Sequence, residues 1–185
     1  MNGKLIFLLG GARSGKSHYA EQWASEHGRH VLFVATAEAY DDEMRDRITR
    51  HRAERPAHWQ TLEAPMNTAE AVSQALAQAQ YDTLVLDCIT LLASNLLLSL
   101  PEDCSQDEAN NVILQEIEAL LVVQSQSSAA WLVISNEVGM GIVPPNRLGR
   151  FYRDALGRAN QRIAQAANEV LLLVAGLPWS LKPDP

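Results

Sequence analysis

The chain has only two cysteines among its 185 residues, Cys88 and Cys104, and they lack the paired spacing of a zinc site. We therefore expect reduced thiols in a cytoplasmic protein, with neither a disulfide framework nor a zinc site. Long apolar runs are also missing, so we expect no stable insertion into a membrane. The short apolar run near the amino end is expected to be a strand and not a signal peptide.

An excess of positive charge is missing as well. Lys and Arg number 15 against 22 Asp and Glu, which gives a formal net charge of −7 at pH 7. General nucleic-acid binding favours a basic surface, so we expect no nucleic-acid partner, although a local basic site for phosphates remains compatible with this charge. The sequence shows no internal repeat, low-complexity segment or long linker. We therefore expect one domain, residues 1–185, with a sizeable core.

The most informative motif lies near the amino end. An apolar stretch, residues 4–9, precedes a glycine-rich segment from Gly10 to Ser17 that has the spacing of a phosphate-binding P-loop. Apolar residues at helical spacing follow it. Glycines let backbone N–H groups turn inward around an anion, and the start of a helix adds unpaired N–H groups. This context predicts nucleotide binding, with Lys16 on the outer phosphates and the Ser17 hydroxyl on a magnesium ion.

Further apolar runs alternate with helical patterns along the chain. This alternation predicts an α/β fold with a mostly parallel sheet and helices on both faces. Ligands of such sheets bind beyond the carboxyl ends of the strands, where we expect Lys16, Thr36, Asp87 and Asn136 to meet. After the first strand, further strands are expected at 30–36, 58–63, 81–88, 130–135 and 169–175, and helices at about 41–55, 67–79, 90–100, 108–124 and 147–166.

Asp87 follows three apolar residues at the end of a predicted strand, which is the usual Walker B arrangement for holding the magnesium of a P-loop. A strand-terminal turn acid is the alternative, and we favour the metal or nucleotide role. The neighbouring Cys88 is interpreted as a small core residue. Four arginines at the start of the last long helix could bind phosphate or form a solvated face, and we favour the latter: Arg147, Arg150, Arg153 and Arg158.

His51 shares one face of a predicted helix with Met44 and Ile48. A histidine in such a line is more often a packing residue. Its arginine neighbours, however, could neutralise a triphosphate while a neutral imidazole attacks it, because histidine can act as a covalent nucleophile. These neighbours are Arg45, Arg47, Arg50 and Arg52.

Six segments together resemble a known family, and the resemblance covers nearly the whole chain. The sequence is similar to the bifunctional adenosylcobinamide kinase / adenosylcobinamide-phosphate guanylyltransferase family of cobalamin biosynthesis. The arginine–histidine helix and the glycine-containing loop after residue 135 are more particular to it than the P-loop. The segments are Gly10 to Ser17, Ala35 to Ala37, Asp41 to Met44, Arg47-Ile48 with His51, Arg55 to Trp59, and Asn136 to Pro144.

This resemblance implies two reactions, a RecA-like P-loop NTPase fold and a homotrimer. In the first reaction, the hydroxyl of adenosylcobinamide takes the γ-phosphate of ATP or GTP. In the second, GTP guanylylates an enzyme histidine, and GMP then passes to adenosylcobinamide phosphate, which gives adenosyl-GDP-cobinamide and pyrophosphate.

By motif position, the resemblance assigns guanylylation to His51, and Lys16 of the P-loop is expected to be catalytic as well. Two departures are visible: Arg50 stands where some relatives have a second histidine, and Asp87 where some have glutamate. The metal would be held by Ser17 and Asp87. The implied nucleotide contacts are Gly10, Gly11, Ala12, Arg13, Ser14, Gly15, Lys16, Ser17, Ala35, Thr36, Ala37, Arg52, Ala53, Glu54, Arg55, Glu63 and Asp87.

Two other functions remain open at this point. A P-loop kinase of another small molecule would need Lys16 and Ser17 but not His51. A nucleotide-dependent switch would show nucleotide-dependent association and no transfer product. The sequence fixes neither the choice between ATP and GTP in the kinase step, nor the residues of the corrinoid pocket, nor the retention of both activities.

Overall fold

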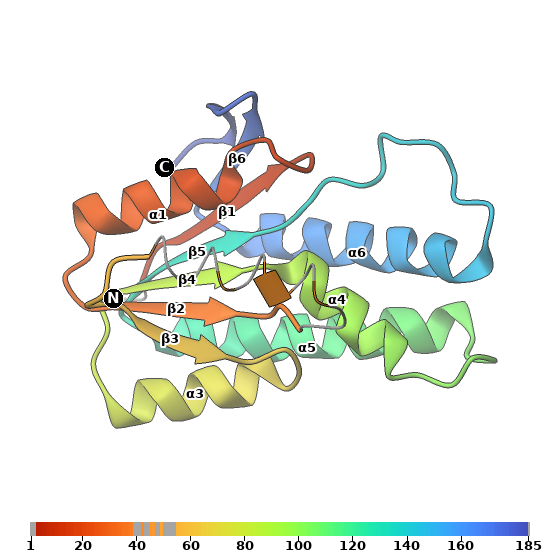
Figure 1. Ribbon diagram of the computed structural model, residues 1–185, viewed down its shortest axis with the longest axis horizontal. Helices are drawn as coiled ribbons and strands as arrows, with labels where there is room; N and C mark the ends of the chain where they lie inside the picture. Colours follow the sequence, from red (N-terminus) through yellow and green to blue (C-terminus); the bar gives the residue numbers. More distant parts are fainter. Residues whose placement is uncertain (1–2, 39–41, 43–44, 47–48, 50–54, 185) are drawn as a thin grey trace.

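The computed structural model describes residues 3–38, 42, 45–46, 49 and 55–184 (Figure 1). Its strands form one seven-stranded sheet in the order β3-β2-β4-β5-β1-β6-β7. Neighbouring strands pair in parallel except β6 and β7, which are antiparallel. The strands are β1 (Leu5–Gly10), β2 (Val31–Ala35), β3 (Gln60–Glu63), β4 (Thr83–Asp87), β5 (Ala130–Ile134), β6 (Glu169–Val174) and β7 (Leu177–Lys182).

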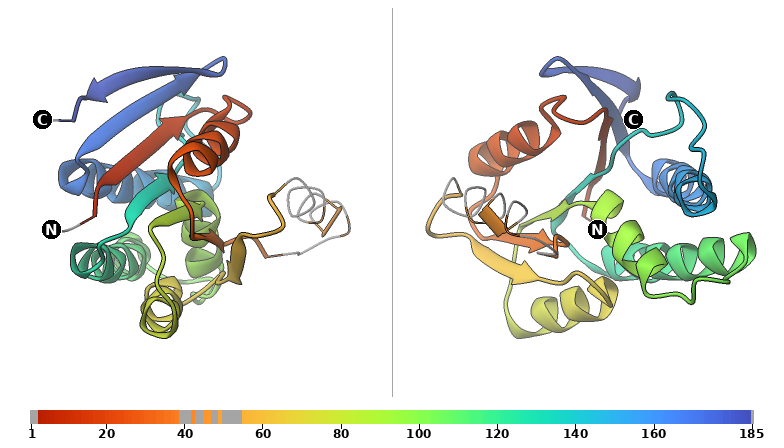
Figure 2. Two further views of the ribbon diagram at one scale, coloured as in Figure 1. Left: turned by 90° about the vertical axis from the view of Figure 1, so that its left-hand side faces the viewer. Right: turned by 45° about the vertical axis from the view of Figure 1, so that its right-hand side comes forward.

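Helices cover both faces of this sheet (Figures 1 and 2). Side chains of β1 alternate between the faces: Leu5 and Phe7 pack in one core cluster with residues of α3 to α6, and Ile6 and Leu8 pack in the other with residues of α1. The strand is therefore apolar at every position because both of its faces are buried. The helices are α1 (Lys16–His27), α3 (Thr68–Gln78), α4 (Ile89–Leu98), α5 (Gln106–Gln126) and α6 (Arg147–Ala166).

The order of the strands confirms the predicted α/β P-loop NTPase fold of the RecA-like type. One strand, β5, separates the P-loop strand β1 from β4, which ends in Asp87. The strand expected at 58–63 is β3, which lies at one edge of the sheet. Among the described residues, no helix has both the length and the apolar character needed to span a membrane.

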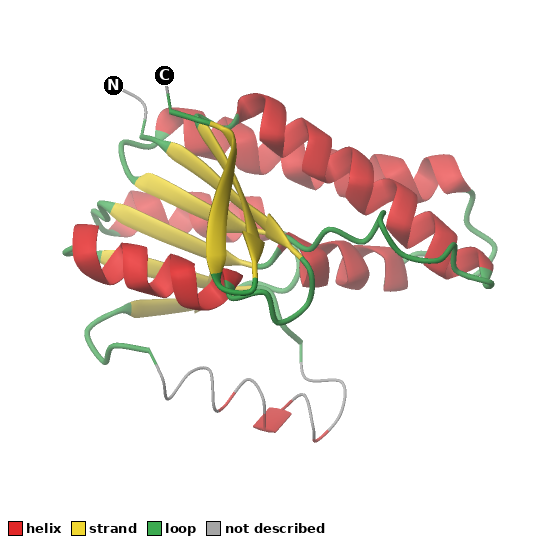
Figure 3. Ribbon diagram, turned by 90° about the horizontal axis from the view of Figure 1, so that it is seen from above, coloured by secondary structure: helices red, strands yellow, loops and turns green. Residues whose placement is uncertain are grey.

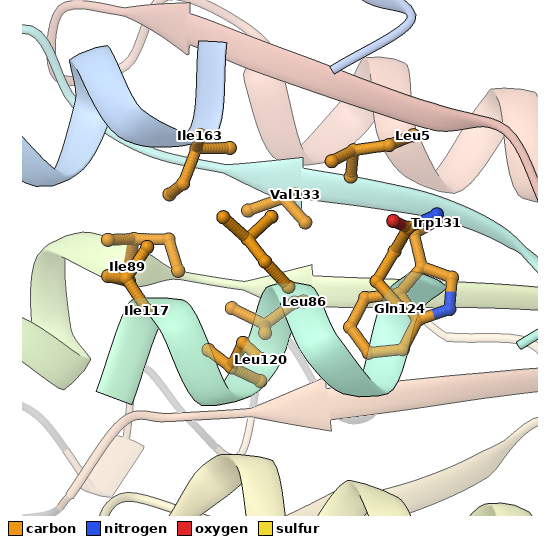
Figure 4. A pocket seen from close by; sticks show the side chains of 10 residues that line it. Leu5, Leu86, Ile89, Ile117, Leu120, Gln124, Trp131, Val133 and Ile163 are labelled. Atoms are coloured by element: carbon orange, nitrogen blue, oxygen red, sulfur yellow. The ribbon is translucent and has the colours of Figure 1, made fainter. Parts of the chain in front are cut away.

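The main core contains a small apolar cavity of about 10 Å³ between the sheet, α5 and α6 (Figure 4). Leu5, Leu86 and Trp131 line it from the strands, and Ile117 and Ile163 line it from the helices. This volume holds at most about one water molecule, and a lining of this kind usually stays dry. The cavity is therefore a packing imperfection, and the chemistry must lie elsewhere.

Most elements lie within a few residues of their expected ranges, and two of the differences have a clear physical reason. Helix α5 begins two residues before the predicted Glu108, because Ser105 and Glu108 form a capping box that satisfies backbone N–H groups at the helix start. The sequence expectation also ended with a strand at 169–175, whereas the chain turns at Ala175 and Gly176 and returns as β7. Both turn residues have positive φ, 51° and 83°, as a two-residue hairpin turn requires.

Candidate nucleotide site

The carboxyl edge of the sheet brings most of the described candidate residues together. Glu63, Ala35 and Asp87 lie side by side at one level of the strands β3, β2 and β4. Asp87 pairs with Ile134 of β5, and Ile134 pairs on its other side with Leu8 of β1, two residues before Gly10. The P-loop and Asp87 therefore share one edge of the sheet, as the sequence predicted.

The P-loop requires glycine at both of its ends. Gly10 has φ of 152°, and a Cβ there would lie 2.5 Å from the carbonyl oxygen of Leu173. Gly15 has φ of 97° and precedes the first residue of α1. Arg13 also has a positive φ, 58°. The loop thus combines conformations that favour inward-turned N–H groups with the start of a helix, an arrangement that is suited to binding an anion.

The turn between β6 and β7 supports this loop from outside. The backbone N–H of Gly176 donates to the Ser14 carbonyl at 2.9 Å. A Cβ at Gly15 would lie 3.0 Å from the Gly176 Cα, so the two backbones are in close contact. Sequence reasoning missed this support, and the only available signal was Gly176 between two apolar segments, because glycine is a common turn residue.

Lys16 lies inside the loop, with 7% of its surface exposed. Its Nζ donates to the carbonyl of Gly11 at 2.7 Å, to that of Gly10 at 3.1 Å and to Ser14 Oγ at 3.4 Å. Burial lowers the pKa of Lys16, and the Cys88 thiol and the Asp87 carboxylate oppose this shift. The ammonium group is therefore held where phosphate oxygens would meet it, within electrostatic reach of Asp87.

Ser17 and Asp87 offer oxygen ligands suited to magnesium, and both residues are half-buried. The described residues contain no group of three or more His, Cys, Asp or Glu side chains that could hold a metal. A site that depends on one hydroxyl and one carboxylate fits a P-loop, where phosphate oxygens and water supply the remaining ligands. The donor set is thus compatible with Mg²⁺ bound together with a nucleotide.

Thr36 is fully buried directly after β2. Its hydroxyl donates to the Cys88 carbonyl at 2.7 Å and accepts the Cys88 N–H at 2.8 Å, and its own N–H donates to the Asp87 carbonyl at 3.1 Å. Asn95 Nδ2 in turn donates to the Thr36 carbonyl at 2.9 Å. These bonds connect the end of β2 to the residues at the end of β4.

Asn136 and Glu137 follow β5 at the same edge. The Asn136 N–H donates to Thr90 Oγ1 at 2.8 Å, and Asn160 Nδ2 donates to the Asn136 carbonyl at 3.0 Å. The Glu137 N–H donates at 3.1 Å to the Gly10 carbonyl, which also accepts from the lysine of the P-loop. The segment after β5 is therefore joined directly to the P-loop.

Three of the five arginines of α6 have a role that the sequence did not reveal: their guanidinium groups donate to backbone carbonyls of segments that precede the helix. Arg153 Nη2 donates to the Gly139 carbonyl at 2.9 Å, Arg150 Nη1 to the Pro145 carbonyl at 2.8 Å, and Arg147 to the Cys104 carbonyl. The three-residue spacing was the available signal, because it places the arginines on one side of the helix.

Several predicted site residues fall on the part of the chain outside the described residues. These are His51, Arg52, Ala53 and Glu54, with much of the predicted helix at 41–55. The guanidinium of Arg55 lies 3.5 Å from the centroid of the Phe33 ring, which stacks on Trp59. Phe33 is in the middle of β2, so the membership of Arg55 in the nucleotide site stays a prediction.

Comparison with solved structures supports the fold. The chain resembles the crystal structure of flagellar accessory protein FlaH from Methanocaldococcus jannaschii, with a TM-score of 0.50, 13% sequence identity, and coverage of 99% of this chain and 80% of that one. At this identity the likeness concerns the fold alone.

Comparison with curated proteins identifies full-length relatives. The chain is 42% identical over 183 residues to the bifunctional adenosylcobalamin biosynthesis protein CobU of Salmonella typhimurium, covering 96% of this chain and 99% of the relative. It is 45% identical over 178 residues to the bifunctional adenosylcobalamin biosynthesis protein CobP of Pseudomonas aeruginosa, covering 96% of this chain and 97% of the relative. Residues 6–181 match the family described as cobinamide kinase / cobinamide phosphate guanyltransferase, and the chain therefore belongs to this family.

Proposed function

We propose that this protein catalyses two successive reactions of adenosylcobalamin biosynthesis. In the first, the hydroxyl of adenosylcobinamide attacks the γ-phosphorus of ATP or GTP, and the nucleoside diphosphate leaves. In the second, GMP from GTP is transferred through an enzyme histidine to adenosylcobinamide phosphate, and pyrophosphate leaves. The observation that carries this proposal is the family match over residues 6–181, and the P-loop, with Lys16 inside it and Asp87 at the same edge of the sheet, supplies the nucleotide site.

Both reactions need a triphosphate held in a fixed orientation, and the P-loop meets this need. Lys16 would exchange its bonds to the carbonyls of the loop for bonds to phosphate oxygens. Its charge would then stabilise the negative charge of the transition state. Ser17 and Asp87 would hold Mg²⁺, which when bound neutralises phosphate charge.

His51 is the proposed nucleophile of the second reaction. A neutral imidazole nitrogen would attack the α-phosphorus of GTP and form a phosphorus–nitrogen bond as pyrophosphate leaves. The phosphate oxygen of the corrinoid substrate would then attack the same phosphorus, and the imidazole would leave. An unperturbed histidine is largely neutral at pH 7, which suits this role.

A homotrimer in the cytoplasm, as the sequence resemblance implies, is the proposed form of the protein. The edge strand β7 displays Leu177, Trp179 and Leu181, which occupy every second position of the strand, as residues of one face do, and are 51–72% exposed. An exposed apolar edge strand is a surface that proteins usually cover, so contacts between copies would explain it. Sedimentation velocity of the purified protein tests the trimer.

The decisive experiment follows two labels of GTP. With the α-phosphate labelled, the protein should retain label after denaturation, whereas γ-labelled GTP should leave none on the protein and should transfer label to adenosylcobinamide. The adduct should be labile to acid and stable to base, as a phosphorus–nitrogen bond would be.

The variant His51→Ala should lose the α-label and the formation of adenosyl-GDP-cobinamide, while phosphate transfer to the hydroxyl survives. The matched control His58→Ala removes an exposed histidine nearby in the sequence and should keep the label. Label retained on His51→Ala, or an acid-stable adduct on Lys16 or a serine, would contradict the assignment. A protein that never takes α-label yet phosphorylates another compound would be a kinase of a different substrate.

A further inference from the structure

The loop between β5 and α6, residues 135–146, carries three large apolar side chains that are mostly exposed in the part of the chain that the structure describes. Ile142 is 96% exposed, Met140 is 85% exposed and Val143 is 61% exposed. In Figures 1 and 3 the loop extends beyond the carboxyl ends of the strands before it reaches the start of α6. The loop therefore lies beyond the same edge of the sheet as the P-loop.

Hydrogen bonds hold the backbone of this loop at its start and near its middle. At its start, the Glu137 N–H donates to the Gly10 carbonyl of the P-loop at 3.1 Å. Further on, Arg153 donates to the carbonyls of Gly139 at 2.9 Å and Gly141 at 3.4 Å. Because the carbonyls on either side of Met140 are bound by α6, the apolar side chains are displayed from a supported backbone.

Such a display needs an apolar occupant, since exposed apolar side chains gain free energy only when they are removed from water. The proposed kinase step requires adenosylcobinamide to place a hydroxyl beside the γ-phosphate at the P-loop. The rest of that substrate is a wide macrocycle whose rim carries apolar methyl groups between its amide side chains. A segment bonded to Gly10 is in the right place to contact a macrocycle whose side arm reaches the P-loop.

We propose that the β5–α6 loop is a binding surface for the corrin macrocycle, with Met140, Ile142 and Val143 as its apolar contacts. This inference rests on the proposed function, because it assigns a binding surface to adenosylcobinamide, the larger substrate of the proposed kinase step. An unbranched methionine suits an irregular ligand surface, because its side chain adapts to the shape that it meets. The exposed apolar residues of β7 are a separate set on an edge strand, which we assign to contacts between copies.

The test measures corrinoid binding separately from nucleotide chemistry. The double variant Met140→Ser/Ile142→Ser should raise the dissociation constant for adenosylcobinamide, and its KM in the kinase step, about tenfold or more. Guanylylation of the protein by α-labelled GTP needs no corrinoid, so its rate should stay within about twofold of the unsubstituted protein. The matched control is Val122→Ser, which removes a 54% exposed apolar side chain from α5 and should change neither quantity.

A second variant, Arg153→Met, leaves the apolar side chains in place but removes the bonds to the loop carbonyls. It should also weaken corrinoid binding, by a smaller factor, and leave guanylylation intact. Unchanged corrinoid binding in the double variant would overturn the inference. Dissociation of the oligomer in sedimentation velocity, with unchanged corrinoid affinity per protomer, would overturn it as well and would make the loop an interface between copies. If the unsubstituted protein takes no α-label, the proposed function fails, and the dissociation constants still decide the inference.

Discussion

The side chain of Thr36 and the backbone of Cys88 exchange two hydrogen bonds. Thr36 Oγ1 donates to the Cys88 carbonyl at 2.7 Å and accepts the Cys88 N–H at 2.8 Å. Thr36 is fully buried, so water cannot replace these bonds. The residue therefore fixes the chain immediately after Asp87, the proposed magnesium ligand, although the two residues come from different strands.

Replacing Thr36 by valine, which has nearly the same shape, should leave the Cys88 N–H without its partner. We expect the free energy of unfolding to fall by about 2 kcal/mol, the cost of an unsatisfied buried polar group, and the rates of both reactions to fall as well. Urea unfolding and steady-state assays measure the two effects. Thr36→Ser keeps the hydroxyl and should retain most of the activity; a valine variant as stable and active as the unsubstituted protein would contradict the role of the hydroxyl.

Cys88 should be unreactive in the folded protein. Burial, followed by the nearby Asp87 carboxylate, raises the pKa of its thiol from 9.0 to about 12. The thiolate fraction at pH 8 should then be about a thousandfold lower than in the unfolded chain, and alkylation by iodoacetamide correspondingly slow. Peptide mapping after timed alkylation checks this, with the protein unfolded in urea as the control. Rapid labelling of Cys88 in the folded protein would contradict the shift.

The same pKa shift predicts the direction of a pH effect on stability. The folded state retains a proton on the Cys88 thiol that the unfolded state loses above about pH 9. The stabilisation from this group is therefore complete below pH 9 and is lost as the pH rises toward 12. The Cys88→Ala variant should lose less stability over this interval than the unsubstituted protein, and equal losses in urea unfolding would contradict the assignment.

The fold could be predicted from the sequence because the local motifs and the alternation of strands and helices along the chain indicate the same architecture. The P-loop spacing, the apolar strands and the helical periods all indicated an α/β sheet, and the ends of the strands then predicted where Lys16 and Asp87 meet. The strand β7 was missed, because an exposed edge strand carries no buried pattern that marks it. Its turn at Gly176 nevertheless supports the P-loop through the carbonyl of Ser14.

The parts of the site that depend on specific contacts between side chains and backbone could not be predicted. Arg153 was interpreted as part of a solvated face, and only the structure shows its bonds to the carbonyls of Gly139 and Gly141. The two-way bonding of Thr36 to Cys88 joins residues 52 positions apart, and no periodicity in the sequence encodes it. His51 stays a prediction from the family resemblance.

Lys16→Met should abolish both reactions with little loss of stability. Methionine keeps the length of the side chain but removes the charge that would meet the phosphates, so we expect the rates of kinase and guanylyl transfer to fall at least about a hundredfold. Stability should change little, because burial already disfavours the ammonium form in the folded protein. Separate assays with γ- and α-labelled GTP measure the two reactions. Near-normal phosphate transfer to adenosylcobinamide would show that the P-loop is not the kinase site.

Asp87→Asn should affect magnesium dependence more than stability. The carboxylate is half-buried at the end of β4, and a neutral amide of the same size keeps the packing while it removes the negative charge that would hold the cation. We expect the rates of both reactions to fall about tenfold or more at fixed magnesium, and the magnesium concentration for half-maximal rate to rise. The free energy of unfolding should change by less than about 1 kcal/mol, since asparagine is nearly isosteric. Magnesium titrations of each rate and urea unfolding provide these numbers, with Asp103→Asn on the exposed surface as the charge-matched control. Full activity of the unsubstituted protein in excess chelator would rule out the metal, and an unchanged magnesium titration in Asp87→Asn would show that this carboxylate is not its ligand.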